Sequence, residues 1–338
     1  MINLTNVQTG FHIPLIKTCH FESLNSLSNV DVLEKAGQKD SSKISRFIEK
    51  KMGIERRFHC DEDVDALDLA KQALGDLVQA DPSILEDADF LIYSGISNPM
   101  PIATHSALLG NEFGFKQPSC WDIKSGCSSG LLALIQANAW LNMGAKRGVI
   151  VASETLSKFS NPDVLQMSAA VGDGAVAFIV EQSDQWHLKS IVHGTDPQYV
   201  TSMLVDAKIP VPNDQYERED FRFTFNDKGN SIEVLGNYWI KSLQELLQSA
   251  GIDGQQVQHY VAHQVDGSKN ALIASSCGIE DGAVAKNFKN YGNMGSPTIF
   301  INYKQWMENN VFKPGEHLVL HAVGGGLSWA GMCLEYKG

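Results

Sequence analysis

The sequence predicts an α/β fold of stacked sheets and helices, built from two similar halves. Short apolar runs rich in β-branched residues alternate with longer segments of helical periodicity along the whole chain. No low-complexity linker interrupts the 338 residues, and two sequence patterns recur in the same order in each half. Alternation of this kind is typical of domains in which layers of helices cover layers of sheet.

The elements that carry this prediction are distributed over the chain. Buried strands are expected at DFLIYSG (89–95), RGVIVAS (147–153), AVAFIVE (175–181), HYVAHQ (259–264) and HLVLHAV (317–323). Helices are expected at 65–79, 128–144, 231–251 and 296–309, where apolar residues recur with helical spacing.

The internal repetition predicts where the halves meet. VGDGAVAFIVE (171–181) resembles VGGGLSWAGMCLE (323–335), and GCSSGLLALIQANAW (126–140) resembles GNMGSPTIFINYKQW (292–306). The order of the two patterns is the same in both halves. We therefore expect an N-terminal half at 1–185 and a C-terminal half at 186–338.

Composition limits the class of protein. The formal net charge of -12 argues against nucleic acid as a partner. No apolar run approaches the roughly 20 residues of a membrane span, and the N-terminus does not resemble a signal peptide. The six cysteines form no CxxC pair, which predicts reduced thiols, no metal site and a cytoplasmic protein.

One basic segment opposes the acidic trend. KISRFIEKKMGIERR, from Lys43 to Arg57, contains only Glu49 and Glu55 as acidic residues. It is either a solvated helix face or a landing site for an anionic group such as a nucleotide phosphate. The sequence leaves both interpretations open.

Cys127 is the first candidate for chemistry. The run CWDIKSGCSSGLLALIQANAW leads from a strand into a turn and then into an apolar helix, with Cys127 at the helix start. Free backbone N–H groups and the helix dipole stabilise an anion there, which predicts a lowered cysteine pKa. A lone cysteine is also commonly a small buried apolar residue, so the position alone does not decide.

Three further features follow in order along the chain. His263 ends an apolar strand, Asn293 lies between Gly292 and Met294 before a helix, and three glycines follow the strand at 317–323. Each has an ordinary structural interpretation, as a loop histidine, a capping residue and a tight turn. The order Cys, His, Asn and Gly-Gly-Gly is far more specific than any one of them.

This constellation, together with VGDGAVAF, LGN (235–237), GNMGSP and GGGLSWAG, resembles the ketoacyl-acyl-carrier-protein synthase III family of thiolase-fold condensing enzymes. The resemblance extends from about residue 52 to the C-terminus. It implies a thiolase fold with five layers, αβαβα, and a homodimer. It also implies acyl thioesters of coenzyme A or of an acyl carrier protein as substrates, with no tightly bound cofactor.

The resemblance assigns roles to individual residues. Cys127 matches the nucleophile, His263 and Asn293 match the pair that binds the malonyl thioester carbonyl, and the N–H groups of Cys127 and Gly325 match the oxyanion hole. Softer matches concern the substrate: Phe47 and Lys51 for the coenzyme A nucleotide, Gly236 and Asn237 for the pantetheine arm, and Met100 for the partner's acyl pocket.

The chain also departs from the family pattern. Val171 and Val323 stand where the prototypes carry Phe, which predicts a wider acyl pocket. Val265, Asp266, Gly267 and Ser268 replace the prototypes' Ala-Asn-Leu-Arg. These changes favour a specialised relative over the initiator of fatty-acid synthesis.

The leading hypothesis is decarboxylative condensation of an acyl group on Cys127 with a malonyl-type thioester, in a fatty-acid or polyketide-type pathway. Plain acyl transfer by the same cysteine is the alternative, although the presence of Asn293 favours condensation. A non-catalytic synthase subunit is less consistent with the retained Cys127.

Overall fold

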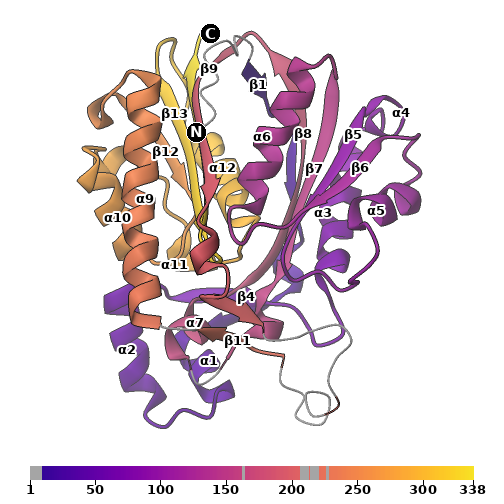
Figure 1. Ribbon diagram of the computed structural model, residues 1–338. Coiled ribbons are helices and arrows are strands. Elements are labelled where there is room, and N and C mark those ends of the chain that lie inside the picture. Colours follow the sequence, from indigo (N-terminus) through magenta and orange to yellow (C-terminus); the bar gives the residue numbers. More distant parts are fainter. Residues whose placement is uncertain (1–9, 162–163, 206–212, 214–220, 226–227) are drawn as a thin grey trace.

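Two sheets form the frame of the molecule in a computed structural model (Figure 1). The structure describes all residues except 1–9, 162–163, 206–212, 214–220 and 226–227. The first sheet is six-stranded, with the order β1-β8-β7-β5-β6 and β2 also paired to β8. Its strands are β1 (Gly10–His12), β2 (Ile16–Thr18), β5 (Phe90–Ser94), β6 (Ser119–Ile123), β7 (Arg147–Thr155) and β8 (Asp173–Ser183).

The second sheet is four-stranded, with the order β12-β13-β14-β9. Its strands are β9 (Trp186–Thr195), β12 (His259–Ala262), β13 (His317–Gly324) and β14 (Ser328–Tyr336). Two small two-stranded sheets lie outside these: β3 (Asn25–Ser28) with β4 (Arg56–His59), and β10 (Met203–Val205) with β11 (Phe223–Phe225).

Both sheets repeat one arrangement of strands. In the first, β5 and β7 are parallel and β8 returns antiparallel to β7; in the second, β12 and β13 are parallel and β14 returns antiparallel to β13. The first sheet draws its strands from residues 10–183 and the second from residues 186–336. We therefore propose that the two halves of the chain meet near residue 185.

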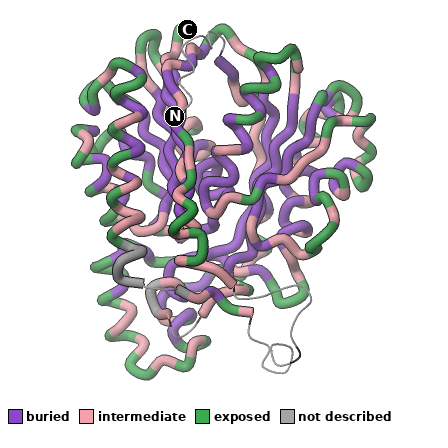
Figure 2. Tube along the Cα trace, in the orientation of Figure 1, coloured by how far each residue is buried: buried purple, intermediate pink, exposed green. Residues whose placement is uncertain are grey.

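Helices form three further layers around the two sheets. Between the sheets lie α6 (Ser129–Asn142) and α12 (Thr298–Asn309), which both contact β8 and β13. The outer face of the first sheet is covered by α3 (Ala66–Ala80) and α5 (His105–Phe113), and α9 (Lys228–Ala250) covers the second. The predicted five-layer α/β architecture is therefore confirmed, and buried residues follow its layers (Figure 2).

The predicted strands and helices all occur, with bounds that differ by a few residues. The remaining helices are short or lie at the end of the molecule that carries α2. They are α1 (Asn29–Lys35), α2 (Ser41–Met52), α4 (Ile84–Asp87), α7 (Leu165–Ala170), α10 (Gly267–Ser276) and α11 (Phe288–Tyr291). Among the described residues, no helix combines the length and apolar character needed to cross a membrane.

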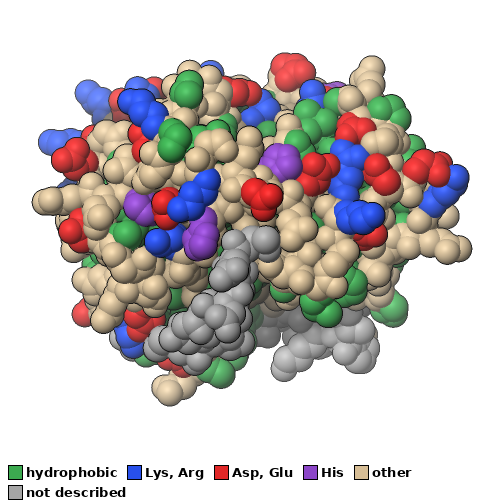
Figure 3. Space-filling view, turned by 90° about the horizontal axis from the view of Figure 1, so that it is seen from above, with side chains coloured by type: hydrophobic (Ala, Val, Ile, Leu, Met, Phe, Trp, Pro, Cys, Tyr) green, Lys and Arg blue, Asp and Glu red, His purple; other side chains and the backbone are tan. Residues whose placement is uncertain are grey.

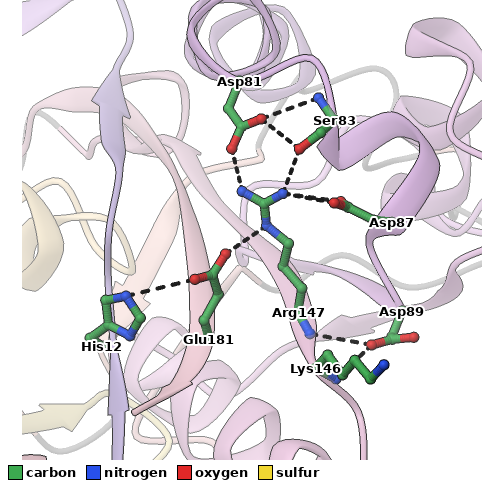
Figure 4. Close-up of polar contacts among 8 residues, drawn as sticks. All are labelled: His12, Asp81, Ser83, Asp87, Asp89, Lys146, Arg147 and Glu181. Carbon is green, nitrogen blue, oxygen red and sulfur yellow. Dashed lines mark hydrogen bonds and ion pairs between the residues drawn. The ribbon is translucent and has the colours of Figure 1, made fainter. Parts of the chain in front are cut away.

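An ion-pair network joins neighbouring segments to the first sheet at the start of β7. Arg147, at the start of β7, forms ion pairs with Asp81, Asp87 and Glu181 and donates to the Ser83 hydroxyl at 2.7 Å (Figure 4). These partners come from the α3–α4 connection, from the end of α4 and from β8. A shared, mostly buried guanidinium with several partners holds such segments together better than isolated surface pairs do.

Candidate active site

The turn before α6 places Cys127 against the glycine turn that follows β13. Gly126 has a φ of +56°, and a side chain there would meet the carbonyl oxygen of Gly325 at 2.5 Å. A side chain at Gly324 would lie 2.6 Å from the backbone nitrogen of Cys127. Both positions therefore require glycine, because the two turns approach at backbone contact.

Serine hydroxyls hold the nucleophile turn in place. The hydroxyls of Ser128 and Ser328 lie 2.7 Å apart, and each is within hydrogen-bond distance of the Ser125 carbonyl, so their two protons are shared among these three contacts. Ser129 donates back to Gly126 and accepts from the N–H of Ser125. Since Ser328 belongs to β14, these bonds join the two halves of the molecule at Cys127.

The electrostatics of Cys127 differ from the sequence-based expectation. Burial raises the pKa of the thiol to about 12, and the nearby Glu154 carboxylate acts in the same direction. The N–H groups of Gly325 and of Cys127 itself reach the sulfur and oppose this rise in pKa. The prediction of a lowered pKa was therefore wrong for the free protein, because desolvation outweighs the helix N-terminus.

Asn293 is held by backbone bonds to the end of α7. Its N–H donates to the carbonyl of Ala170 at 2.7 Å, and its carbonyl accepts from Gly172 at 2.9 Å. Its side-chain oxygen Oδ1 accepts from the N–H of Gly295 at 2.9 Å. Because a backbone N–H can only donate, this bond leaves the side-chain amide N–H₂ as a donor for another group.

His263 follows β12 and is completely buried. Its backbone N–H donates to the carbonyl of His321 at 2.8 Å, while both ring nitrogens lack a hydrogen-bond partner in the described chain. Burial lowers the pKa of the imidazole to about 3, so the ring is neutral at physiological pH. A buried polar group without a partner is costly, which makes these nitrogens candidates to bind a ligand.

A cavity of about 410 Å³ joins most of these residues. Its lining is mainly apolar, and it includes the predicted residues Cys127, Val171, Gly236, Asn237, Asn293, Val323 and Gly325. His263 is not part of this lining. However, Trp239, which stacks on the His263 ring, and Val265, two residues along the chain, both line the cavity.

The remaining predicted residues lie farther out. Phe47, which is 60% exposed, and Lys51 line a smaller neighbouring cavity of about 260 Å³. The two cavities share Met52, Asp266 and Lys269, so the smaller one adjoins the larger. Met100 lines neither; it is half-exposed in the loop between β5 and α5.

The basic segment 43–57 is only partly a surface feature. Arg57 is completely buried and donates to the carbonyls of Leu27 and Ala169 and to the Asn29 side chain. It belongs to the support of α7, which carries the Asn293 contacts. The cations on α2, namely Lys43, Arg46, Lys50 and Lys51, form no ion pair among the described residues.

Residues 265–268, where the chain departs from the family pattern, connect α10 to its surroundings. Asp266 caps α10 by accepting from the N–H groups of Ser268 and Lys269, and it lines the cavity. The Ser268 hydroxyl donates to the carbonyl of Lys51 at 3.1 Å. These residues thus join α10 to α2 beside the smaller cavity.

Glu154 is a site residue that sequence reasoning missed. It is completely buried at the end of β7 and accepts from the N–H groups of Ile96 and Ser97 and from the Ser97 hydroxyl at 2.5 Å. Burial raises the pKa of its carboxyl to about 7. The available signal was a charged residue directly after the apolar run RGVIVAS.

Several residues that narrow the apolar part of the cavity were also not identified from the sequence. The methyl group of Met203 lies where a side chain at Gly325 would be, 2.0 Å from the ideal Cβ position. Met167 and Phe223 line the same region. No local pattern marks them, because β10, β11 and α7 meet Cys127 only in the folded chain.

The fold and this site define a class, the thiolase-fold condensing enzymes. Residues 121–197 match the family model described as 3-Oxoacyl-[acyl-carrier-protein (ACP)] synthase III, and residues 247–336 match that of its C-terminal part. The chain belongs to the ketoacyl-acyl-carrier-protein synthase III-like family and is an acyltransferase of the condensing type.

Individual relatives are distant. The chain is 26% identical to a beta-ketoacyl-[acyl-carrier-protein] synthase III of Deinococcus deserti, an alignment that covers 86% of this chain and 83% of the relative. A Thermus thermophilus synthase III structure matches with a TM-score of 0.83, 24% identity and coverage of 96% and 99%. OleA of Xanthomonas campestris, solved with lauric acid and lauroyl-CoA, gives 0.79 at 19% identity, with coverage of 96% and 99%.

Proposed function

We propose that the protein loads an acyl group on Cys127 from an acyl thioester and then condenses it with a malonyl-type thioester. The observation that carries this proposal is the cavity itself. It presents the Cys127 thiol, the Gly325 turn and the free amide donor of Asn293 on one apolar surface. Plain acyl transfer has little need for that second donor.

In the first step the sulfur attacks the thioester carbonyl, whose oxygen becomes an oxyanion. The N–H groups of Cys127 and Gly325, which already reach the sulfur, are placed to donate to it. The carbon–sulfur bond to the donor then breaks, and the thiol proton of Cys127 ends on the leaving thiolate. A neutral resting thiol therefore supplies the proton that this exchange requires.

In the second step the malonyl unit loses CO₂, and the electron pair of the broken bond forms an enolate. Neutral donors from His263 and Asn293 would stabilise the enolate oxygen as its charge develops. The enolate carbon attacks the acyl carbonyl on Cys127, and collapse of that adduct releases the Cys127 thiolate and a 3-oxoacyl thioester. An unpartnered, neutral imidazole suits this role because it gains a partner only when substrate binds.

We further propose a homodimer that acts in the cytoplasm on coenzyme A or carrier-protein thioesters. In the described chain β6 pairs only with β5, so one edge of the first sheet is open. Half-exposed Met100 and exposed Ile102 lie in the loop just before α5, where a second subunit would cover them. All six cysteines are free, which suits a reducing compartment.

The substrate proposal is an acyl group bulkier than acetyl, used in a specialised fatty-acid or polyketide-type pathway. Val171 and Val323 are nearly inaccessible to water and line the cavity, where larger residues would reduce its volume. A structure of the same fold has been solved with lauroyl-CoA. Methionine side chains at 167 and 203 give the apolar wall an adaptable shape.

The test is to incubate the protein with a panel of acyl-CoAs and record its intact mass, then add malonyl-CoA. We expect one acyl mass on the Cys127 peptide, absent in Cys127→Ser, followed by CO₂ release and a 3-oxoacyl product. Acylation of Cys120 or Cys277 would overturn the nucleophile assignment. Transfer to a simple nucleophile without CO₂ release would instead identify a plain acyltransferase.

A further inference from the structure

A buried polar cluster lies beside His263 and has no part in the reaction described so far. It consists of Trp239, Ser242, Tyr260 and His321, all 2% exposed or less. The His321 ring is bonded at Nε2 to the Ser242 hydroxyl at 2.9 Å and at Nδ1 to the Tyr260 hydroxyl at 3.1 Å. Polar groups are costly to bury, so such a cluster needs a structural or functional reason.

The segments around His263 are hydrogen-bonded to His321. The His321 carbonyl accepts the backbone N–H of His263 at 2.8 Å. Tyr260 precedes His263 by three residues on β12, and Ser242 lies one turn beyond Trp239 on α9. One side chain of β13 is thus bonded to both α9 and β12.

Trp239 contacts the His263 ring directly. The two rings are nearly parallel, at 12°, with centroids 6.2 Å apart. Hydrogen bonds usually fix the orientation and tautomer of a functional histidine, but neither nitrogen of His263 has a partner in the described chain. In the free protein the flat indole thus lies where it can limit rotation of the imidazole, with no hydrogen bond at the ring nitrogens to do so.

We propose that Trp239, held in place by His321 and Ser242, is a positioning residue that orients His263 toward the thioester carbonyl during condensation. The inference rests on the proposed function. It concerns the decarboxylative step alone, because acylation takes place at Cys127, in the turn before α6, and does not use His263. A misoriented donor loses transition-state stabilisation even when the fold is intact.

The test compares Trp239→Leu, which removes the flat ring, with Trp239→Phe, which keeps one. Trp186→Leu is the matched control, since Trp186 is also buried but packs edge-on against Phe312 and at a tilt against Tyr336, at the end of β14 away from Ser328. For each variant we would measure Cys127 acylation by intact mass, malonyl-CoA decarboxylation and melting temperature.

In Trp239→Leu we expect the ratio of condensation to acylation rate to fall by about 10²-fold, the effect of a small misplacement. Trp239→Phe should recover most of this ratio, and Ser242→Ala should lower it by up to about tenfold. Trp186→Leu should lower the melting temperature without changing the ratio.

Two outcomes overturn the inference while wild-type condensation is observed. One is an unchanged ratio in Trp239→Leu; the other is a loss in Trp239→Phe as large as in Trp239→Leu, which would mean that ring stacking is not the cause. If the wild-type protein acylates Cys127 but never releases CO₂, the proposed function fails and the inference with it. The wild-type measurement therefore distinguishes the two failures.

Discussion

Cys127 in the N-terminal half and His263 in the C-terminal half are buried to a similar degree, yet burial moves their pKa values in opposite directions. It raises that of the thiol to about 12 and lowers that of the imidazole to about 3. Both groups are consequently neutral at physiological pH. Desolvation disfavours whichever form is charged, and the sign of the shift follows from the chemistry of the group.

The two residues differ in what surrounds them. Backbone N–H groups reach the sulfur of Cys127, whereas the ring of His263 has no hydrogen-bond partner in the described chain and rests against an indole. The surroundings of Cys127 therefore suit a site where negative charge develops during acylation. The ring of His263 is free to donate a hydrogen bond to the enolate oxygen. This difference assigns acylation to the half that carries Cys127 and enolate stabilisation to the half that carries His263. Measuring acylation and condensation separately tests the assignment.

The largest effect is expected from Asn293→Ala. The variant should still acylate Cys127, because the free amide donor of Asn293 serves the enolate and not the nucleophile. Losing one aimed donor typically lowers the rate by about 10²–10³-fold. Condensation should fall by that amount in single-turnover assays; normal condensation would show that the two steps are not divided as proposed.

The pH dependence of Cys127 alkylation tests its environment directly. Only the thiolate reacts, and at any pH well below a pKa of about 12 the thiolate fraction rises about tenfold per pH unit. Iodoacetamide labelling of the Cys127 peptide should thus accelerate about 100-fold between pH 7 and 9. A plateau below pH 8 would show that the helix N-terminus and the two N–H groups outweigh burial.

A smaller effect is expected from Val171→Phe, which fills part of the cavity beside Cys127. Each buried methylene contributes about 0.8 kcal/mol, so the wild-type protein should acylate faster with medium-length donors than with acetyl-CoA. Val171→Phe should reverse this order. Competition between the two donors, followed by intact mass, measures it, and a strict acetyl preference in the wild type would contradict the pocket proposal.

The smallest effect concerns α2, outside the buried site. On the face seen in Figure 3, acidic and basic side chains are interspersed, whereas the cations of α2 are unpaired in the described chain. Lys50→Glu with Lys51→Glu should slow acylation by acyl-CoA a few-fold at low ionic strength and less at physiological salt.

An uncharged N-acetylcysteamine thioester is the control for this pair. Its reaction with Cys127 should be nearly unaffected, because it has no phosphate to attract. Equal slowing of both donors would show that the segment supports structure, as the buried Arg57 at its end already does.

The sequence by itself determined the strands, the helices, the duplicated order of motifs and the glycine-flanked position of Cys127. These depend on periodicity and on neighbours in the chain, which local preferences can specify. Only the tertiary structure decided that Cys127 is a neutral thiol, that Arg57 is buried, and that Trp239 lies against His263. Desolvation and stacking depend on which distant segments pack together, and for Cys127 burial in the folded chain outweighs the local effect of its helix.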